Sequence, residues 1–405
     1  MPIKLKVART AEELDDVFKL RYDVYVSERD KFSDKRAAGD GRITDHFDAL
    51  PDVANVVVYD GDTAVASFRV NKDSASGLAP EKYFDFNQVR ARIAQVSDGG
   101  SSVPCIVSGS MLAIRKQWRH KRNVIFALFK KTTAVMRGWG ATHVFGAASA
   151  ETFSLYGRLG FNSIAKEEWV ESVGDRLIPM MAPFDKVFTW AFGQDLPVKK
   201  QFWLDNSCAE FETLLLSPGE VLFHENDEAE YAYSIEKGGV SISRQGLDRK
   251  EIVSPQLGKG ALFGELAVFN DECRTTTATA TMNTQIIAIK RKQLLDIVHQ
   301  NNDKMDQLLC HLSQRLRQAD QVTSVQKFTP QASRVSHALE RLWRSVKAQE
   351  ECLAVRTLNV GTEQIAKRVE LSESEECRAS GGLDCGDAMR HFFRAPSSDG
   401  FVSAS

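Results

Sequence analysis

The chain has 405 residues, a length that predicts two or three domains rather than one hydrophobic core. Its formal net charge of −2 excludes a global attraction to nucleic acid or to an anionic membrane. No apolar run is long enough to cross a bilayer, and the N-terminus lacks a signal-peptide core. The seven cysteines include no C-x-x-C pair, so we expect buried, reduced thiols in a cytoplasmic protein and no metal site.

The first part of the chain alternates strand and helix patterns. Thr10 and Glu13 form a capping box, which predicts an amphipathic helix that runs toward Tyr25. Asp60-Gly61-Asp62 joins two β-rich runs and predicts a hairpin. The other expected elements are a strand over 3–8, a strand over 103–114, a helix over 122–136, a strand over 143–148, a short helix over 153–159 and final strands after 161.

This order of elements resembles the GNAT acyltransferase fold. The phrase Leu155-Tyr156-Gly157-Arg158-Leu159-Gly160-Phe161 is similar to the closing motif of that superfamily, in which the tyrosine often protonates the departing thiolate. The resemblance implies an α+β acyltransferase domain over residues 1–185 with Tyr156 as a catalytic residue. The alternative for Tyr156 is a core aromatic residue on a helix.

Four charged residues in the front half carry a narrower resemblance. Arg21, the pair Asp45 and Asp48, and Arg69 are similar to the charged constellation of acyl-homoserine-lactone synthases and the related N-acyl amino acid synthases. Those enzymes move a fatty acyl group from a carrier thioester to an amine. Where the lactone synthases have Glu-x-Ser-Arg, this chain reads Ser108-Gly109-Ser110-Met111. This difference disfavours lactone synthesis and leaves an amino acid or another amine as the acceptor.

The chemistry of thioester aminolysis assigns a role to each of these residues. The reaction needs a neutral amine, a stabilised oxyanion and a proton for the leaving sulfur. Asp45 and Asp48 would hold the acceptor ammonium and relay its proton, and Tyr156 would protonate the sulfur. Arg69 or Arg21 would pair with an acceptor carboxylate. The competing interpretation is an ion-pair network that only fixes the N-terminal lobe.

A basic turn precedes the helix expected over 122–136. It contains Arg115, Arg119, Lys121 and Arg122, in the position where GNAT proteins grip the pyrophosphate of coenzyme A with a glycine-rich turn. This chain lacks those glycines, so side chains would supply more of the contact. A basic rim also suits the acidic surface of an acyl carrier protein, and either donor remains open. The alternative is a solvated basic face.

Residues 186–204 form an aromatic connector that we expect to be docked rather than free. Beyond it, short strands separated by turn residues predict a small β jelly-roll over residues 205–300. Ser217-Pro218-Gly219-Glu220 and Gly238-Gly239 are examples of the turn sequences.

The most informative stretch of this second domain runs from Phe263 to Ala280. It is similar to the phosphate-binding cassette of cyclic-nucleotide-binding domains found in catabolite-activator-like regulators, kinases and channels. The resemblance implies that Arg274 pairs with the cyclic phosphate and that Glu265 accepts from the ribose hydroxyl. The cassette residues are Phe263, Gly264, Glu265, Leu266, Ala267, Arg274, Thr275 and Thr276. Both cAMP and cGMP remain open, and so does a jelly-roll that has lost its ligand.

The C-terminal part, residues 301–372, is expected to be helical. Residues 301–328 would form a lid or a homodimer helix, and residues 361–372 resemble the first half of a helix-turn-helix. The acidic residues that follow are wrong for a helix in the major groove, so DNA is an unlikely partner. Residues 373–405 are expected to form a disordered tail.

The sequence therefore predicts a cytoplasmic N-acyltransferase regulated by a cyclic nucleotide. Its donor would be a coenzyme A or carrier-protein thioester, and its acceptor a small-molecule amine such as an amino acid. One alternative is a protein lysine acetyltransferase under the same control. Others are a nucleotide-responsive transcription regulator with an inert front domain and a nucleotide-binding scaffold without catalysis.

Overall fold

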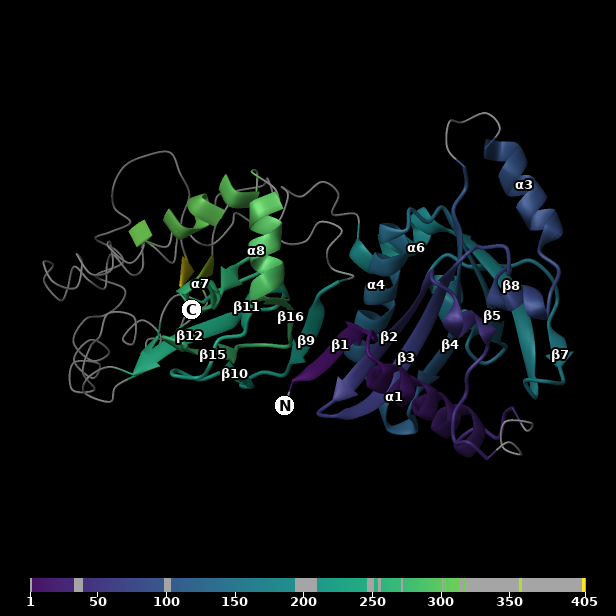
Figure 1. Ribbon diagram of the computed structural model, residues 1–405, viewed down its shortest axis with the longest axis horizontal. Coiled ribbons are helices and arrows are strands. Elements are labelled where there is room, and N and C mark those ends of the chain that lie inside the picture. Colours follow the sequence, from purple (N-terminus) through teal and green to yellow (C-terminus); the bar gives the residue numbers. More distant parts are fainter. Residues whose placement is uncertain are drawn as a thin grey trace, which may run out of the picture.

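The computed structural model describes residues 2–32, 39–97, 103–193, 210–245, 251–253, 256–270 and 272–300, short pieces between 302 and 317, and the pairs 357–358 and 403–404. These residues form two lobes (Figure 1). We call residues 2–193 the first lobe and residues 210–317 the second lobe. One sheet runs through both of them.

The first lobe is built on a sheet with the strand order β1-β2-β3-β4-β5-β8-β6, to which β7 is added through β8. β4 and β5 are parallel, and the other neighbouring pairs of this lobe are antiparallel. The predicted hairpin is confirmed, because β2 and β3 pair on either side of Gly61. The strands are β1 (Ile3–Val7), β2 (Val53–Asp60), β3 (Thr63–Lys72), β4 (Ile106–Ile114), β5 (His143–Ser149), β6 (Asn162–Ser163), β7 (Glu168–Val170) and β8 (Asp175–Pro183).

Helices cover both faces of this sheet, because its strands alternate between two apolar clusters. In β2, Val56 and Val58 pack beneath α4 and α6, whereas Val57 and Tyr59 pack beneath α1. This period of two is the one that a sheet buried on both faces requires. The helices are α1 (Ala11–Tyr22), α3 (Asn87–Ser97), α4 (Arg122–Gly138), α5 (Phe153–Arg158) and α6 (Phe184–Phe192).

The helix α1 begins at the predicted capping box. The Thr10 hydroxyl accepts a hydrogen bond from the Glu13 N–H at 3.2 Å, and the Glu13 carboxylate accepts from the Thr10 N–H at 3.3 Å. The regular helix ends at Tyr22 rather than continuing to Tyr25, since a π-helical turn over Asp23–Ser27 follows it.

The helix α6 crosses the expected domain boundary at residue 185. Phe184, Val187 and Phe188 belong to the apolar core of the first lobe, and Trp190 packs against Phe129 of α4. The start of the aromatic connector is therefore part of the first lobe, because its apolar residues recur at helical spacing.

The strands β4 and β5 separate partway along their length. They pair only from Ile106 and His143 to Ser108 and Phe145. Beyond that point β4 changes its register against β3, and Met111 takes a positive φ of 53°. An extra residue in one strand bends it away from its neighbour. The first lobe consequently opens between the ends of β4 and β5.

The second lobe contains two facing groups of strands. Phe223, Ile235, Ile242 and Ala278 fill the space between them. One group has the order β14-β11-β16-β9 and the other the order β10-β15-β12-β13. The strands are β9 (Glu212–Leu216), β10 (Val221–Phe223), β11 (Tyr231–Lys237), β12 (Val240–Gln245), β13 (Glu251–Val253), β14 (Leu262–Phe263), β15 (Thr277–Ala280) and β16 (Thr284–Lys290). The helices are α7 (Glu265–Asn270) and α8 (Arg291–Gln300).

The N-terminal strand β1 joins the two lobes. Lys4 pairs with Tyr59 of β2 on one side and with Leu214 of β9 on the other. In Figure 1, β1 lies between β9 and β2 at the centre of the molecule. The side chain of Leu215 packs in the core of the first lobe. The sequence predicted two domains but gave no sign of this shared sheet.

The remaining predictions concern the C-terminal part. In the described pieces after residue 301, Met305, Leu308 and Leu312 pack against the second lobe, and Leu309 and Leu316 are exposed. A dimer through residues 301–328 stays a prediction. The helix-turn-helix expected at 361–372 lies outside the described residues. So does the tail 373–405 apart from Ser403–Ala404 (β18), which pairs with Thr357–Leu358 (β17).

Candidate functional site

A cavity of about 290 Å³ opens where β4 and β5 separate. We call it the main cavity. Its wall is largely apolar and includes Phe47, Phe68, Ile125, Leu155 and Met180. Charged residues also line it, namely Arg29, Lys31, Asp45, Arg69, Lys82, Arg119 and Asp175. A long apolar site with a few polar groups is the usual form of a small-molecule pocket.

The four charged residues singled out in the sequence form one ion-pair network beside this cavity. Arg21 Nη1 donates to both carboxylate oxygens of Asp48 at 3.0 Å. Arg69 Nη1 lies 2.6 Å from Asp45 Oδ1 and 2.9 Å from Asp48 Oδ2. Arg69 Nε also donates to Ser110 Oγ at 3.0 Å. The network ties α1, β3 and β4 to the segment that carries the two aspartates.

The spacing Asp45-x-x-Asp48 has a local structural reason. Asp45 caps a short 3₁₀ helix, His46–Ala49, and accepts a hydrogen bond from the Phe47 N–H at 3.0 Å. Asp48 reaches back to the Asp45 N–H at 3.2 Å. The two aspartates thus form a capping box. Its local hydrogen bonds hold both carboxylates in place independently of the arginines.

Only half of the network faces the main cavity. Asp45 and Arg69 line it, whereas Arg21 and Asp48 are not among its lining residues. The Arg21 side chain is 0% exposed and that of Asp48 is 5% exposed, compared with 25% for Asp45. Asn55, which the sequence did not single out, also accepts a hydrogen bond from Arg21. Arg69 is also 0% exposed, so Asp45 is the partly exposed member of the network on the main cavity.

The pKa values follow from this arrangement. Burial disfavours the charged form of Asp45, but the hydrogen bonds and positive charge of Arg69 outweigh it and lower the pKa of Asp45 below its ordinary value. Burial likewise opposes the charge of Arg69, and its two carboxylate partners raise its pKa. Asp45 therefore remains a carboxylate at neutral pH and is suited to hold a cation rather than to accept a proton.

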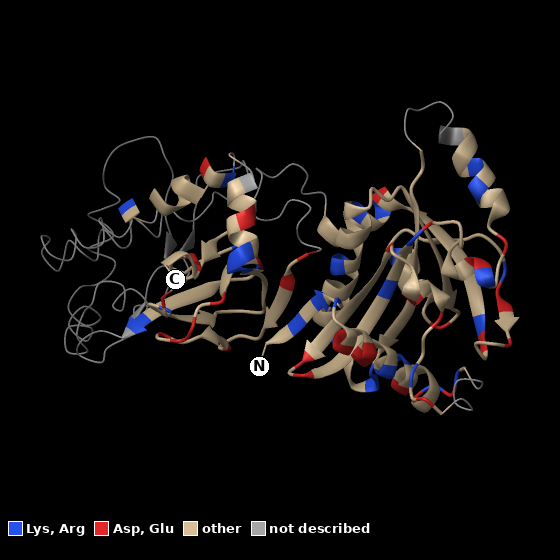
Figure 2. Ribbon diagram, viewed as in Figure 1, with Lys and Arg blue, Asp and Glu red and all other residues tan. Residues whose placement is uncertain are grey.

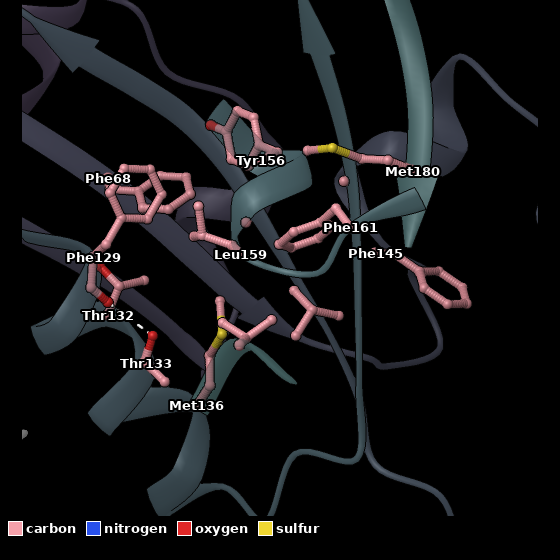
Figure 3. A pocket seen from close by; sticks show the side chains of 14 residues that line it. Phe68, Phe129, Thr132, Thr133, Met136, Phe145, Tyr156, Leu159, Phe161 and Met180 are labelled. Carbon is pink, nitrogen blue, oxygen red and sulfur yellow. Dashed lines mark hydrogen bonds between the residues drawn. The ribbon is translucent and has the colours of Figure 1, made fainter. Parts of the chain in front are cut away.

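Tyr156 lies on the far wall of the main cavity. Its ring packs edge-on against Phe129 and Phe161, and burial raises the pKa of its hydroxyl above the ordinary value. Behind it is a smaller void of about 20 Å³, which we call the inner void. Figure 3 shows Thr132, Thr133 and Met136 on one side of the inner void, with Tyr156 and Met180 on the opposite side. Tyr156 thus occupies both a core position and a cavity wall.

The basic turn is less basic than its sequence indicated. Arg115 Nη2 lies 2.9 Å from Asp23 Oδ2, and Arg119 pairs with Glu28. Lys121 lies over the ring of Trp118, 5.3 Å from its centroid. Arg122 is exposed at the start of α4. Figure 2 shows acidic and basic positions interspersed over both lobes. Of the four predicted donor-binding residues, Arg119 lines the main cavity.

In the second lobe, the backbone of the expected nucleotide site has the predicted form. Gly264 has a φ of 70° and is followed by α7, which begins at Glu265. Asn226 takes a φ of 74°, so asparagine there does adopt the left-handed conformation. Glu265, Phe263 and Ala267 are buried, and Leu266 is exposed.

Arg274 lies beside this turn with its guanidinium directed inward. Nη1 donates to the Gly264 carbonyl at 2.7 Å, and Nη2 donates to the Tyr231 carbonyl at 2.6 Å. The guanidinium also lies 4.3 Å from the ring centroid of Phe223. Thr275, which is exposed, and Thr276, which is half-buried, follow Arg274 before β15. A phosphate bound here would have to replace carbonyl oxygens as the partner of Arg274.

No helix in the described part of the chain is long and apolar enough to cross a membrane. The same described residues contain no group of three or more histidine, cysteine, aspartate or glutamate side chains placed to hold a metal ion.

The buried pair generates a prediction about stability. Asp48→Asn should lower the free energy of unfolding by about 3–5 kcal/mol, because it leaves the fully buried Arg21 without its charge partner. Glu167→Gln is the control, since Glu167 pairs with Arg176 on the surface at 3.0 Å and such pairs contribute less than about 1 kcal/mol. Urea unfolding followed by tryptophan fluorescence measures both. Equal unfolding midpoints for Asp48→Asn and the unmodified chain would contradict the assignment.

Two segments of the chain are similar to known protein families. The family described as N-acyl amino acid synthase FeeM matches residues 16–183, and the cyclic nucleotide-binding domain matches residues 214–301. A solved structure of FeeM, an N-acyl amino acid synthase from uncultured soil microbes, aligns with 15% sequence identity and a TM-score of 0.37, and covers 47% of this chain and 94% of that one.

Two sequence relatives each match little more than a third of this chain. The cyclic AMP receptor protein of Thermus thermophilus is 28% identical over 141 residues, which are 35% of this chain and 65% of that protein. A CRP-like cAMP-activated global transcriptional regulator of Mycobacterium tuberculosis is 29% identical over 151 residues, 37% of this chain and 67% of the relative. The chain thus spans less than two thirds of the Thermus protein. Residues 16–183 are thus similar to the FeeM N-acyl amino acid synthase family, and residues 214–301 are similar to cyclic nucleotide-binding domains.

Proposed function

We propose that this protein is an N-acyltransferase that moves an acyl group from a thioester to the amine of an amino acid, under the control of a cyclic nucleotide. The first lobe would be a GNAT-like acyltransferase and the second a jelly-roll that binds the nucleotide. The observation that carries the proposal is that Tyr156, Asp45 and Arg69 face one apolar cavity between the separated ends of β4 and β5. This cavity lies within the segment that matches the FeeM family.

The acceptor would bind at the Asp45 end of the cavity. Asp45 offers a partly exposed carboxylate to the acceptor ammonium, and the four-residue network holds that carboxylate in place. Arg69 already donates to Asp45, Asp48 and Ser110, so it acts as a positioning residue. Because its pKa is lowered, Asp45 is a weak base. The ammonium would lose its proton to water, and the rate should rise with pH as more of the amine becomes neutral.

The thioester would lie along the open edge of β4. Among the described strands, β4 has no partner beyond Ser108 on the side that faces β5. Backbone N–H groups on this edge are positioned to stabilise the oxyanion that forms when the amine attacks the thioester carbon. This attack forms the C–N bond. The oxyanion then collapses, the C–S bond breaks, and Tyr156 gives its proton to the departing sulfur. Burial raises the pKa of the Tyr156 hydroxyl, so it is protonated at neutral pH but is a weaker acid than an ordinary tyrosine.

The shape of the cavity favours a fatty acyl group over an acetyl group. Its volume of about 290 Å³ and its wall of Phe47, Phe68, Ile125 and Leu155 offer far more apolar surface than two carbons fill. Each methylene buried in such a site contributes about 0.8 kcal/mol. This observation supports amino acid acylation over lysine acetylation. Coenzyme A and an acyl carrier protein both remain candidate carriers.

The second lobe would bind the nucleotide through Arg274 and Glu265. The cyclic phosphate would take the place of the Gly264 and Tyr231 carbonyls as the partner of the Arg274 guanidinium. A charged partner is the stronger one for an arginine fork. Burial lowers the pKa of Arg274, and an anion next to it would oppose that effect. Glu265 would accept from the ribose hydroxyl.

The direct test of the function is release of free thiol from a dodecanoyl thioester. Each donor, on coenzyme A or on a carrier protein, is incubated with a mixture of amino acids, with and without cAMP or cGMP. We expect release that requires the amino acids and that a nucleotide changes by about 5- to 150-fold. No release with either donor, together with salt-dependent binding to duplex DNA, would overturn the proposal in favour of a transcription regulator.

Tyr156→Phe tests the proposed acid. We expect kcat to fall by about 10²–10⁴ with little change in KM for the donor, because the hydroxyl acts only in the transition state. The control is Tyr25→Phe, a second tyrosine on the main cavity whose hydroxyl donates to the Leu112 carbonyl at 2.8 Å. Equal turnover of Tyr156→Phe and the unmodified protein would return Tyr156 to a purely structural role.

Arg274→Ala tests the nucleotide site. Loss of the charge partner of a buried phosphate should weaken cAMP binding by about 2–5 kcal/mol, as measured by calorimetry. Since Arg274 also holds the Gly264 and Tyr231 carbonyls, thermal unfolding of the variant is measured in parallel. Glu265→Gln is a second variant that leaves this cation in place. Unchanged affinity in a folded Arg274→Ala protein would remove the site from this turn.

A further inference from the structure

The helix α4 carries residues of the acyl site on one face and residues of the interlobe contact on another. Thr132, Thr133 and Met136 line the inner void behind Tyr156. The preceding residues, Lys130 and Lys131, contact the second lobe. A single rigid helix therefore lies between the two functional parts of the chain.

The inner void is suited to the end of a fatty chain. Phe68, Tyr156 and Met180 line both the main cavity and the inner void, so their side chains form the partition between the two. Thr132 and Thr133 donate their hydroxyls to the Leu128 and Phe129 carbonyls at 2.7 and 2.9 Å and leave their methyl groups for the void. The side of α4 that lines the inner void is thus apolar, although it carries two threonines.

Met180 is the movable part of this partition. A Cβ atom added to Gly146 would lie 2.9 Å from the Met180 Cε atom. The methionine thus lies directly against a glycine, and its flexible side chain has three rotatable bonds. Rotation of Met180 would connect the main cavity with the inner void. An acyl chain too long for the main cavity would then end against α4.

The opposite face of α4 is held by the second lobe. Lys131 is 4% exposed and donates to the Phe211 carbonyl, next to β9. Lys130 Nζ lies 2.7 Å from Glu236 Oε1 at the end of β11, and Glu236 also accepts from Gln285. These contacts are largely shielded from water, so they are stronger than surface ion pairs. They reinforce the backbone pairing of β1 with β9.

The strand β11 also reaches the nucleotide site. At its other end the Tyr231 carbonyl accepts from Arg274, and the Tyr233 ring lies 5.3 Å from the same guanidinium. Arg274 and Lys130 are therefore linked by one strand, with Glu236 at its far end. A phosphate that draws Arg274 away from Tyr231 would remove a hydrogen bond at one end of β11. The other end of this strand contacts α4.

We propose that the second lobe sets the acyl chain length that the first lobe accepts, by holding the α4 wall of the inner void. This inference rests on the proposed function and names the part of its substrate that the nucleotide controls. A chain that ends in the main cavity does not touch that wall. A chain that enters the inner void does, and each methylene accommodated there improves its binding about fourfold.

The experiment measures kcat/KM for butanoyl, octanoyl, dodecanoyl and hexadecanoyl thioesters with and without cAMP or cGMP, using the full chain. We expect the effective nucleotide to change the ratio of hexadecanoyl to butanoyl transfer by at least about fivefold. A nucleotide effect of the same size for every chain length would overturn the inference and leave the proposed function standing. No nucleotide effect on any donor would overturn the regulation itself, and the inference with it.

Two variants of α4 locate the coupling. Lys130→Ala removes the Glu236 contact and should reduce the chain-length effect of the nucleotide, with butanoyl transfer unchanged. Arg137→Ala is the matched control on the same helix. Both cations lie over aromatic rings of α6, Lys130 over Phe192 at 5.1 Å and Arg137 over Phe188 at 4.6 Å. Arg137→Ala should keep the chain-length effect. Equal effects in both variants would contradict the proposal.

A binding measurement separates coupling from catalysis. Coupling between two sites is reciprocal, so a ligand at one site changes the affinity at the other by the same factor. A non-reactive hexadecanoyl thioether should alter the nucleotide Kd in the unmodified protein, whereas the butanoyl analogue should not. Gly146→Ala places a methyl group 2.9 Å from the Met180 Cε atom and restricts the rotation of this partition residue, so it should remove the hexadecanoyl effect. Persistence of that effect in Gly146→Ala would place the coupling elsewhere.

Discussion

The pairing of β1 with both β2 and β9 is the constraint on which the arrangement of the molecule depends. A strand in the middle of a sheet has its N–H and C=O groups satisfied on both sides, so neither neighbour can leave without exposing them. The first residues of the chain thus complete the acyltransferase sheet and hold the second lobe against it. Leu215 of β9 adds an apolar contact to the same core. Two domains tied in this way respond to each other more directly than domains on a flexible tether.

Within the first lobe, charge is used in two different ways. Arg21 and Asp48 form a buried pair, whose value lies in fixing the geometry because desolvation offsets much of the attraction. Arg69 and Asp45 extend that pair to the cavity wall, where a carboxylate remains partly exposed. The buried pair of Arg21 and Asp48 thus holds Arg69 and Asp45, the carboxylate proposed to bind the acceptor. Ser110 on β4 accepts a hydrogen bond from Arg69 and so supports the arginine rather than contacting the proposed acceptor.

Arg274, the cation predicted to bind the phosphate, already has partners within the second lobe. Arg274 donates to two backbone carbonyls and lies against Phe223, so its charge is partly satisfied within the protein. Exchange of neutral carbonyls for an anion releases Tyr231 at the end of β11. Glu236 at the other end of this strand contacts Lys130 of α4. A change at the proposed phosphate site would therefore reach the first lobe through one strand and one helix.

The sequence by itself determined the local features. The Thr10 capping box and the hairpin at Gly61 depend on near neighbours, and the structure contains both of them. The sequence could not show which residues of the charged network are buried, since the burial of Asp48 and the exposure of Asp45 depend on which elements pack over them. Likewise, Asp23 and Glu28 neutralise the basic turn across about 90 residues of chain. Only the tertiary structure joined the lobes through β1, because strand pairing between distant segments leaves no periodic signal in either one.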